Sequence, residues 1–202
     1  LEKESVFGQT FSYKGEKFAI SLAGVYQKEN AVLALNALEE LDRLGWTTTM
    51  EQRKDGLLHT SWKGRFTVIN KKPLFIVDGA HNAGAADKMA ESVRHYFNGK
   101  KLIYIMGVFA DKEYKIVLEK TAHFAEKIYT IETPDNPRAL PAEELAKAAR
   151  VYNSSAESTK SIKDAVEKAF SCAGDDENSV ILAFGSLSFI GALTNAVEEY
   201  VG

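Results

Sequence analysis

The feature that most constrains the fold is an alternation, from Arg65 to the end of the chain, between short apolar runs and longer amphipathic stretches. Most of the apolar runs lack the polar alternation of half-exposed strands, which indicates strands buried on both faces. A sequence in which strands and helices alternate in this way predicts a mostly parallel sheet with right-handed crossovers and helices on both faces, an α/β fold. The predicted strands are Phe66–Ile69, Leu74–Val77, Leu102–Met106, Lys127–Ile131 and Val180–Phe184, and the predicted helices are Ala83–Phe97, Glu113–Ala125, Ala142–Ala149, Ile162–Cys172 and Leu187–Tyr200.

A different pattern occupies the first sixty residues. Ser5–Tyr13 and Lys17–Leu22 flank a Lys-Gly-Glu turn and are typical of a hairpin. One helix is predicted after Gly24–Asn30, and a shorter one from an N-cap at Thr49. The longer helix carries a row of leucines on one side, namely Leu35, Leu38, Leu41 and Leu44.

We therefore predict a small α+β part over residues 1–60 and a separate α/β domain over residues 61–202. Because the chain opens at Leu1, inside hairpin-like sequence, we expect the first part to complete a larger domain whose beginning lies upstream.

The charge and composition exclude several classes of partner. The net charge is −3 and no block of Lys or Arg occurs, so neither nucleic acid nor an anionic membrane is expected to bind. Cys172 is the one cysteine, which excludes an internal disulfide and favours a cytoplasmic protein. No apolar run approaches the roughly 20 residues that a membrane span requires.

Three polar segments follow predicted strands: Asp78–Asn82, Gly107–Lys112 and Gly185–Ser186. The carboxyl ends of parallel strands meet at one rim of a sheet, where ligands commonly bind, so we expect a site there. Asp78 and His81 come just before a helix N-terminus at Asn82, which offers N–H groups to an anion. An ordinary capped turn would explain the same residues.

Cationic and hydroxyl side chains extend this candidate site. Lys112 could receive a carboxylate while the preceding Asp111 caps the next helix, and Ser186 could bind an anion or simply act as an N-cap. Arg138 lies in a Pro-rich loop expected at the same rim, which could also be a plain connector.

Two further candidates lie earlier in the chain. Arg65, in the turn Trp62–Arg65, has the planar guanidinium suited to bidentate phosphate contact, although the residues of this turn alone favour an interdomain hinge with a solvated Arg. Asn30 could present its amide to an adenine edge or cap the leucine-rich helix. Neither G-x-x-x-x-G-K-[ST] nor G-x-G-x-x-G occurs, which argues against a complete P-loop enzyme and a standard NAD-binding domain.

Four segments in this order and spacing resemble the C-terminal half of the bacterial folylpolyglutamate synthase/dihydrofolate synthase family, within the Mur ligase superfamily. The sequence departs from the family pattern at Tyr26, where many relatives have His, and at Lys63 and Ala83, where Pro is common. The matching segments are Gly24–Ala31, Trp62–Phe66, Val77–Asn82 and Phe184–Leu187.

The resemblance implies a Rossmann-like closing domain over residues 61–202, and it implies that residues 1–60 end an ATPase domain whose P-loop lies upstream. In this family, ATP and Mg²⁺ phosphorylate a carboxylate of dihydropteroate or a folate, and the amine of L-glutamate then attacks the acyl phosphate. Such a protein would act as a monomer together with its own N-terminal ATPase domain. The present chain alone would lack the complete activity.

Site roles follow from the same resemblance. Asn30 would face the adenine, Arg65 would reach the phosphates, and Asp78 with His81 would contact ribose and phosphate; Arg65 and His81 are the catalytic candidates. The glutamate carboxylates would be held by Lys112, Ser186 and Arg138, and the metal ligands would lie mainly upstream.

Two alternatives remain open at the level of sequence. One is a non-catalytic Rossmann-like module that binds a nucleotide or a protein. The other is a peptidoglycan-precursor ligase of the same superfamily, against which the segment Asp78–Asn82 argues.

Overall fold

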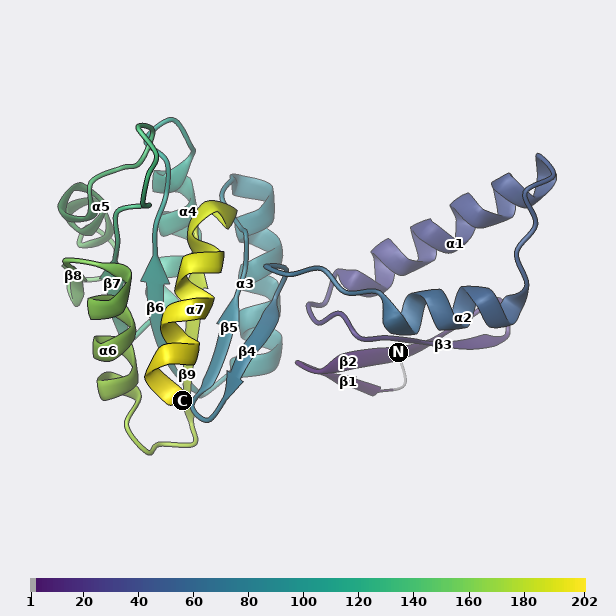
Figure 1. Ribbon diagram of the computed structural model, residues 1–202, viewed down its shortest axis with the longest axis horizontal. Helices are drawn as coiled ribbons and strands as arrows, with labels where there is room; N and C mark the ends of the chain where they lie inside the picture. The colour runs from purple at the N-terminus through teal and green to yellow at the C-terminus, as the bar shows by residue number, and fades with distance from the viewer. Residues whose placement is uncertain (1–2) are drawn as a thin grey trace. The chain divides into compact units, whose positions relative to one another are not determined.

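The computed structural model describes residues 3–202 and divides into two compact units, Leu1–Phe66 and Thr67–Gly202 (Figure 1). The sequence boundary near residue 60 falls a few residues before this division. No helix within residues 3–202 combines the length and apolar character needed to cross a lipid bilayer.

The first unit is a three-stranded antiparallel sheet with two helices on one side of it. The expected hairpin is present: Tyr13 pairs with Glu16, and Lys14 and Gly15 both have the positive φ that a tight two-residue turn requires. The single strand expected over Ser5–Tyr13 is instead two strands, because the chain reverses before Gly8, whose φ is +137°. The elements are β1 (Lys3–Ser5), β2 (Gly8–Tyr13), β3 (Glu16–Ile20), α1 (Gln27–Arg43) and α2 (Met50–His59).

The core of this unit is small, and α1 contributes only its first half to it. Phe11 and Phe18 stack with ring centroids 5.8 Å apart, and Leu35 packs against the same cluster. The predicted leucine row is only partly buried, because Leu41 is 43% exposed and Leu44 is 75% exposed. The predicted N-cap of α2 is confirmed, since Thr49 forms a reciprocal capping box with Gln52.

The second unit is a six-stranded sheet between two layers of helices, in the order β4-β5-β9-β6-β7-β8. All neighbouring strands are parallel except β4, which is antiparallel to β5 at one edge. The mostly parallel sheet is therefore confirmed. The strands are β4 (Thr67–Lys71), β5 (Leu74–Val77), β6 (Lys101–Met106), β7 (Lys127–Thr130), β8 (Ala156–Ser158) and β9 (Ser179–Phe184).

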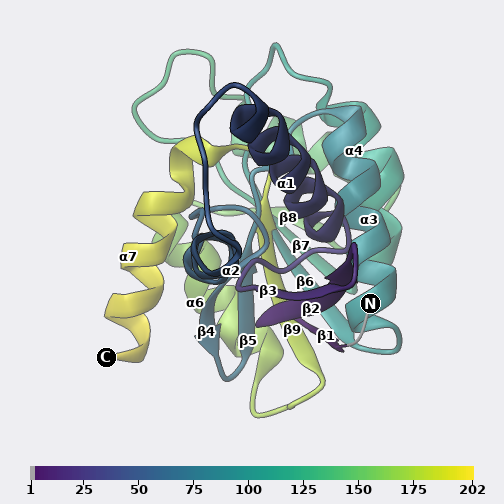
Figure 2. The same ribbon diagram turned by 90° about the vertical axis from the view of Figure 1, so that its right-hand side faces the viewer.

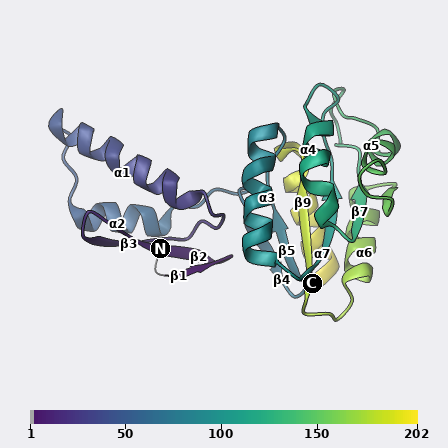
Figure 3. The ribbon, with the colours of Figure 1, turned by 180° about the vertical axis from the view of Figure 1, so that it is seen from behind.

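The helices cover both faces of this sheet. Figure 1 views the unit from the side of α6 and α7, Figure 3 views it from the side of α3 and α4, and Figure 2 shows the sheet between these layers. Helix α5 packs against α4 and against strands β7 and β8. The helices are α3 (Ala83–Phe97), α4 (Tyr114–Thr121), α5 (Ala142–Ala149), α6 (Ile162–Ala173) and α7 (Ile190–Val201), with 3₁₀ turns η1 (Ala122–Phe124) and η2 (Leu187–Phe189).

The structure differs from the sequence expectation mainly at helix ends and at one strand. The helix expected over Glu113–Ala125 finishes in η1, and the one expected over Leu187–Tyr200 begins with η2. Strand β8 was not expected, because three residues that are only partly apolar give no period to recognise.

The strand order determines where the polar loops lie. Strand β9 comes last along the chain but lies between β5 and β6, and all six of its residues are buried. The carboxyl ends of β5, β9 and β6 are consequently neighbours, and each leads into one of the three polar segments noted in the sequence.

Candidate functional site

Two glycines let the loops after β9 and β6 approach each other closely. Gly185 has φ +115°, and a Cβ atom there would lie 2.4 Å from the carbonyl oxygen of Gly107. The Gly107 N–H donates a hydrogen bond of 3.3 Å to the carbonyl of Phe184. Any other residue at Gly185 would force the two backbones apart, so glycine is a steric requirement of this rim.

A pocket of about 210 Å³ opens between the three loops. His81 comes from the loop after β5, Lys112 from the loop after β6, and Ser186 from the loop after β9. The structure thus brings together three of the predicted site residues. The complete lining is His81, Phe109, Lys112, Gly185, Ser186, Leu187 and Ser188.

The turn after β5 fixes Asp78 and His81 by local hydrogen bonds. Asp78 is 4% exposed, its N–H donates to Ala183 at 2.8 Å, and its Oδ1 accepts from the N–H of Ala80 at 2.8 Å. Nδ1 of His81 lies 2.7 Å from the carbonyl oxygen of Gly79. Because a carbonyl only accepts, this contact selects the tautomer with a proton on Nδ1 and leaves Nε2 for a ligand.

The N-terminus of α3 is less open to an anion than the sequence suggests. Asn82 is the N-cap, as expected, and accepts from Ala85 N–H at 2.9 Å. The N–H of Ala83 donates to the carboxylate of Glu113 at 3.2 Å. Two N–H groups of the first turn are therefore occupied by side chains, and no sequence pattern indicates that Glu113 reaches α3.

Ser186 is held at the start of η2 in the N-cap role that the sequence predicted. It is 6% exposed, and its hydroxyl accepts from Ser188 N–H at 3.3 Å and lies 2.7 Å from the Ser188 hydroxyl. Both serines line the pocket, and their hydroxyl groups are linked to each other. Ser188 was missed because a single serine inside a predicted helix carries no sequence signal.

Lys112 is half-buried at the pocket, and within residues 3–202 its ammonium makes no hydrogen bond or ion pair. The expectation that Asp111 caps the following helix is wrong. The N-cap of α4 is Glu113, without a side-chain cap, and Asp111 pairs with Arg138 instead. An aspartate two residues from the helix start is out of reach of the N-cap geometry.

Arg138 contacts Asp111 through two hydrogen bonds, Nε to Oδ1 at 3.2 Å and Nη2 to Oδ2 at 2.5 Å. These bonds lower the pKa of the Asp111 carboxyl below its usual range and raise the pKa of the Arg138 guanidinium. The guanidinium also lies over the ring of Phe109, 4.8 Å from its centroid. Arg138 is thus beside the pocket but does not line it.

The remaining two candidates belong to the first unit. Asn30 donates a side-chain hydrogen bond to Gln27 at 2.9 Å within α1, so part of its amide serves the helix itself. The Trp62–Arg65 turn closes through a hydrogen bond of 3.3 Å from Arg65 N–H to the Trp62 carbonyl, with Gly64 at φ +81°. This confirms the predicted tight turn.

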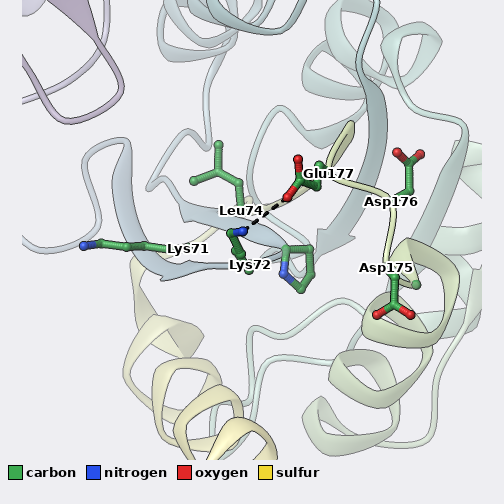
Figure 4. Close-up of a pocket in the computed structure, with 8 residues that line it drawn as sticks. Lys71, Lys72, Leu74, Asp175, Asp176 and Glu177 are labelled. Carbon is green, nitrogen blue, oxygen red and sulfur yellow. Dashed lines mark hydrogen bonds and ion pairs between the residues drawn. The ribbon is translucent and has the colours of Figure 1, made fainter.

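A larger pocket, about 460 Å³, lies at the opposite end of the sheet, where β4 turns into β5 and the chain enters β9. Figure 4 shows that Lys71 points away from the acidic loop and that Asp175 and Asp176 point to opposite sides. Lys72 and Glu177 neutralise each other in an ion pair of 3.2 Å. Without convergent polar groups, this pocket is the weaker candidate.

The hydrogen-bond donors of the pocket between the three loops, which we call the strand-end pocket, suit an anion. The pocket offers an ammonium and hydroxyl groups, which can donate to carboxylate or phosphate oxygens, and an imidazole whose Nε2 can do so when both ring nitrogens carry a proton. Within residues 3–202, no cluster of three or more His, Cys, Asp or Glu is placed to hold a metal ion.

The second unit is thus an α/β domain of the class whose ligands bind in a crevice at the carboxyl ends of its parallel strands. A family model described as Mur ligase, glutamate ligase domain matches residues 64–187, which is more than half of the chain. The chain belongs to this family.

Curated relatives support the same assignment. The dihydrofolate synthase/folylpolyglutamate synthase of Bacillus subtilis is 29% identical over 197 residues, covering 95% of this chain and 45% of that protein. The folylpolyglutamate synthase of Lacticaseibacillus casei is 28% identical over 141 residues, covering 67% of this chain and 33% of that protein. The chain spans less than half the length of these relatives.

Solved structures confirm the Rossmann-like fold. Folylpolyglutamate synthase from Mycobacterium tuberculosis, complexed with ADP and AMPPCP, has a TM-score of 0.81 at 24% identity, covering 100% of this chain and 47% of its own. The folylpolyglutamate synthase of Thermotoga maritima has a TM-score of 0.77 at 26% identity, covering 98% and 45%. The resemblance seen in the sequence, to the C-terminal portion of such enzymes, is confirmed.

Proposed function

We propose that this chain is the C-terminal part of an ATP-dependent ligase that adds L-glutamate to a folate or to dihydropteroate through an acyl phosphate. The observation that carries the proposal is the strand-end pocket, where Lys112, His81 and Ser186 converge in a chain that belongs to the glutamate ligase domain family. The names of the curated relatives agree with this reaction.

Positioning and charge stabilisation would provide most of the catalysis in this part of the enzyme. The ammonium of Lys112 and the hydroxyl of Ser186 would hold a carboxylate of the incoming glutamate. ATP, with Mg²⁺ bound mainly by the upstream domain, would supply the phosphoryl group that activates the folate carboxylate. With its Nδ1–H held by the Gly79 carbonyl, His81 would donate to a phosphate oxygen through Nε2–H in its imidazolium form, and Asp78 would orient the turn that carries His81.

Two residues of the first unit are also proposed to contact ATP. Arg65 has the guanidinium that can neutralise charge on the transferred phosphoryl group, and Asn30 would face the adenine. Arg65 and His81 are therefore the proposed catalytic residues.

We assign residues 1–60 to the C-terminal end of the ATPase domain and residues 61–202 to the closing domain. Support comes from two large apolar side chains turned away from the sheet: Leu33 of α1 is 70% exposed, and Leu44, the C-cap of α1, is 75% exposed. The same face also carries polar residues such as Glu29 and Glu40, so a covering domain would meet a mixed surface. The upstream ATPase domain is the partner proposed for this face, in a monomeric cytoplasmic enzyme.

The test uses the full-length protein that contains this chain, supplied with ATP, Mg²⁺, L-glutamate and a folate. We expect phosphate release together with a folate that is longer by glutamate residues. Lys112→Ala removes a charge-assisted hydrogen bond and is expected to raise the KM for glutamate roughly tenfold to hundredfold. The matched control is Lys115→Ala, an exposed lysine on α4 that does not line the pocket and should leave the KM unchanged.

A full-length protein that releases no phosphate and lengthens no folate would refute this proposal. A substrate panel that favours a peptidoglycan precursor would assign the protein to the other branch of the superfamily. Calorimetry on the 202-residue chain tests the remaining alternative, a non-catalytic nucleotide-binding module. If the chain is part of a ligase, we expect its ATP binding to be weak or undetectable. Tight ATP binding by this chain alone would favour an autonomous nucleotide-binding module.

A further inference from the structure

Three side chains beside the strand-end pocket form one contact set. The guanidinium of Arg138 holds both carboxylate oxygens of Asp111 and stacks over the ring of Phe109. We call Arg138, Asp111 and Phe109 the clasp. The clasp joins two loops, because Asp111 and Arg138 are 27 positions apart in the sequence.

The backbone of the same two loops is also joined. The N–H of Ala110 donates to the carbonyl of Arg138 at 2.8 Å, and the N–H of Leu140 donates to the carbonyl of Val108 at 3.0 Å. Between these bonds, Phe109 and Ala139 form an isolated antiparallel bridge. The loop after β6 is therefore held in place by the loop that follows β7.

The clasp controls the two residues of this loop that reach the pocket. Phe109 lines the pocket directly, and Arg138 stacks on its ring. Lys112 lines the pocket too, follows Asp111 in the chain, and donates its N–H to the carbonyl of Phe109 at 3.1 Å. Fixing Asp111 and Phe109 thus fixes the backbone on the N-terminal side of Lys112.

The exposure of the clasp argues for a local role. The side chains of Arg138 and Asp111 are 52% and 53% exposed, so solvent screens the pair and its contribution to global stability is small. A guanidinium can hold a carboxylate through two parallel bonds and stack on a ring at the same time, whereas an ammonium is a point charge. The arrangement orients a loop more effectively than it stabilises a fold.

We propose that Arg138 is a positioning residue, which acts on the substrate through Asp111 and Phe109 by holding Lys112 at the pocket, and that it does not itself bind the substrate. This inference rests on the proposed function, in which Lys112 receives a glutamate carboxylate. It differs from the role that the family resemblance implies for Arg138, which is direct contact with glutamate.

The first experiment measures hydrogen exchange in residues 107–112 of the full-length protein, and it requires no activity. We expect Arg138→Ala and Asp111→Asn each to raise the exchange of this segment about fivefold, since the loop loses its outer contact. Arg138→Lys should give a smaller increase. Arg43→Ala, which breaks an exposed Arg–Glu pair on α1, is the matched control and should leave the segment unchanged.

The second experiment measures the kinetics of glutamate addition. Arg138→Ala and Asp111→Asn should each raise the KM for glutamate about fivefold, with kcat changed by less than about twofold and the KM for ATP unchanged. The charge-exchanged double variant Asp111→Arg with Arg138→Asp should recover most of the loss. A KM that stays normal in Asp111→Asn, or a double variant as poor as Arg138→Ala, would show that Arg138 contacts the substrate itself.

The two experiments separate failure of this inference from failure of the proposed function. Unchanged hydrogen exchange in both single variants overturns the clasp, whatever the protein catalyses. A wild-type protein that lengthens no folate overturns the proposed function, and faster exchange in the variants would still support the clasp as the device that positions Lys112.

Discussion

Gly185 offers the sharpest test of how the pocket is built. Replacing it with alanine has two costs that can be assigned separately. Its φ of +115° lies in a region that residues with a Cβ rarely adopt, which costs about 2 kcal/mol within a usual range of about 1–3. The added Cβ would also lie 2.4 Å from a backbone oxygen of Gly107 and 2.8 Å from Val108 Cγ1.

The second cost is one of overpacking. The nearest atom belongs to the backbone, which cannot rotate away as a side chain could, so we assign about 2 kcal/mol more to this clash. Gly185→Ala should therefore destabilise the protein by about 4 kcal/mol. Spread over a chain of this size, that corresponds to a fall in Tm of roughly 12 °C.

Gly174 is the matched control. Its φ is also positive, +56°, but a Cβ there would meet nothing within 4 Å. Gly174→Ala should therefore show only the backbone cost, about 2 kcal/mol. Urea denaturation followed by circular dichroism measures both variants, and the reasoning is refuted if they lose the same free energy of unfolding. The test compares the two single variants only, so a second substitution elsewhere that restores the stability of Gly185→Ala is not part of it.

Three further predictions concern the second unit's periphery, its core and the first unit. Glu157→Gln should cost about 1 kcal/mol at pH 7, because hydrogen bonds from Lys127 and then Lys168 lower the pKa of this carboxyl. A lowered pKa stabilises the fold above the usual carboxyl range and loses that effect as the pH falls through and below that range, so the difference from wild type should shrink towards acidic pH in urea titrations. Leu182→Ala removes a fully buried side chain from β9 and should cost about 3 kcal/mol by the same assay, whereas a loss below about 1 would contradict the packing described. Thr49→Ala breaks the capping box of α2 and should cost about 1 kcal/mol, with amide exchange rising in the first turn of that helix and not in α1.

Features fixed by neighbouring residues could be predicted from the sequence. The apolar runs of β5 and β9 are typical of strands buried on both faces of a sheet, and both strands were expected at nearly their observed positions. The same holds for Asn82, Ser186 and Thr49, whose side chains bond to N–H groups two or three residues ahead. A local bond of this kind needs no knowledge of the rest of the fold.

Features that depend on distant residues could not be predicted. The sequence placed three polar loops at one rim but could not tell that β9 lies between β5 and β6. It assigned Asp111 to the adjacent helix, whereas the partner of Asp111 is Arg138, which reaches it from the loop after another strand. Ion pairs at the surface leave no periodic signal, because a charged side chain is equally acceptable with a partner or in water.

The central position of β9 in the sheet also has a consequence for folding during synthesis. Synthesis delivers β5 and β6 well before the strand that joins them, so until β9 emerges each presents an open edge of N–H and C=O groups. Before β9 is made, the sheet consists of two separate halves. The pocket cannot form at that stage, because Gly185 and Ser186, which line it, directly follow β9. Premature termination between β8 and β9 would leave two half-sheets with open edges, which makes such products natural targets for chaperones and proteases.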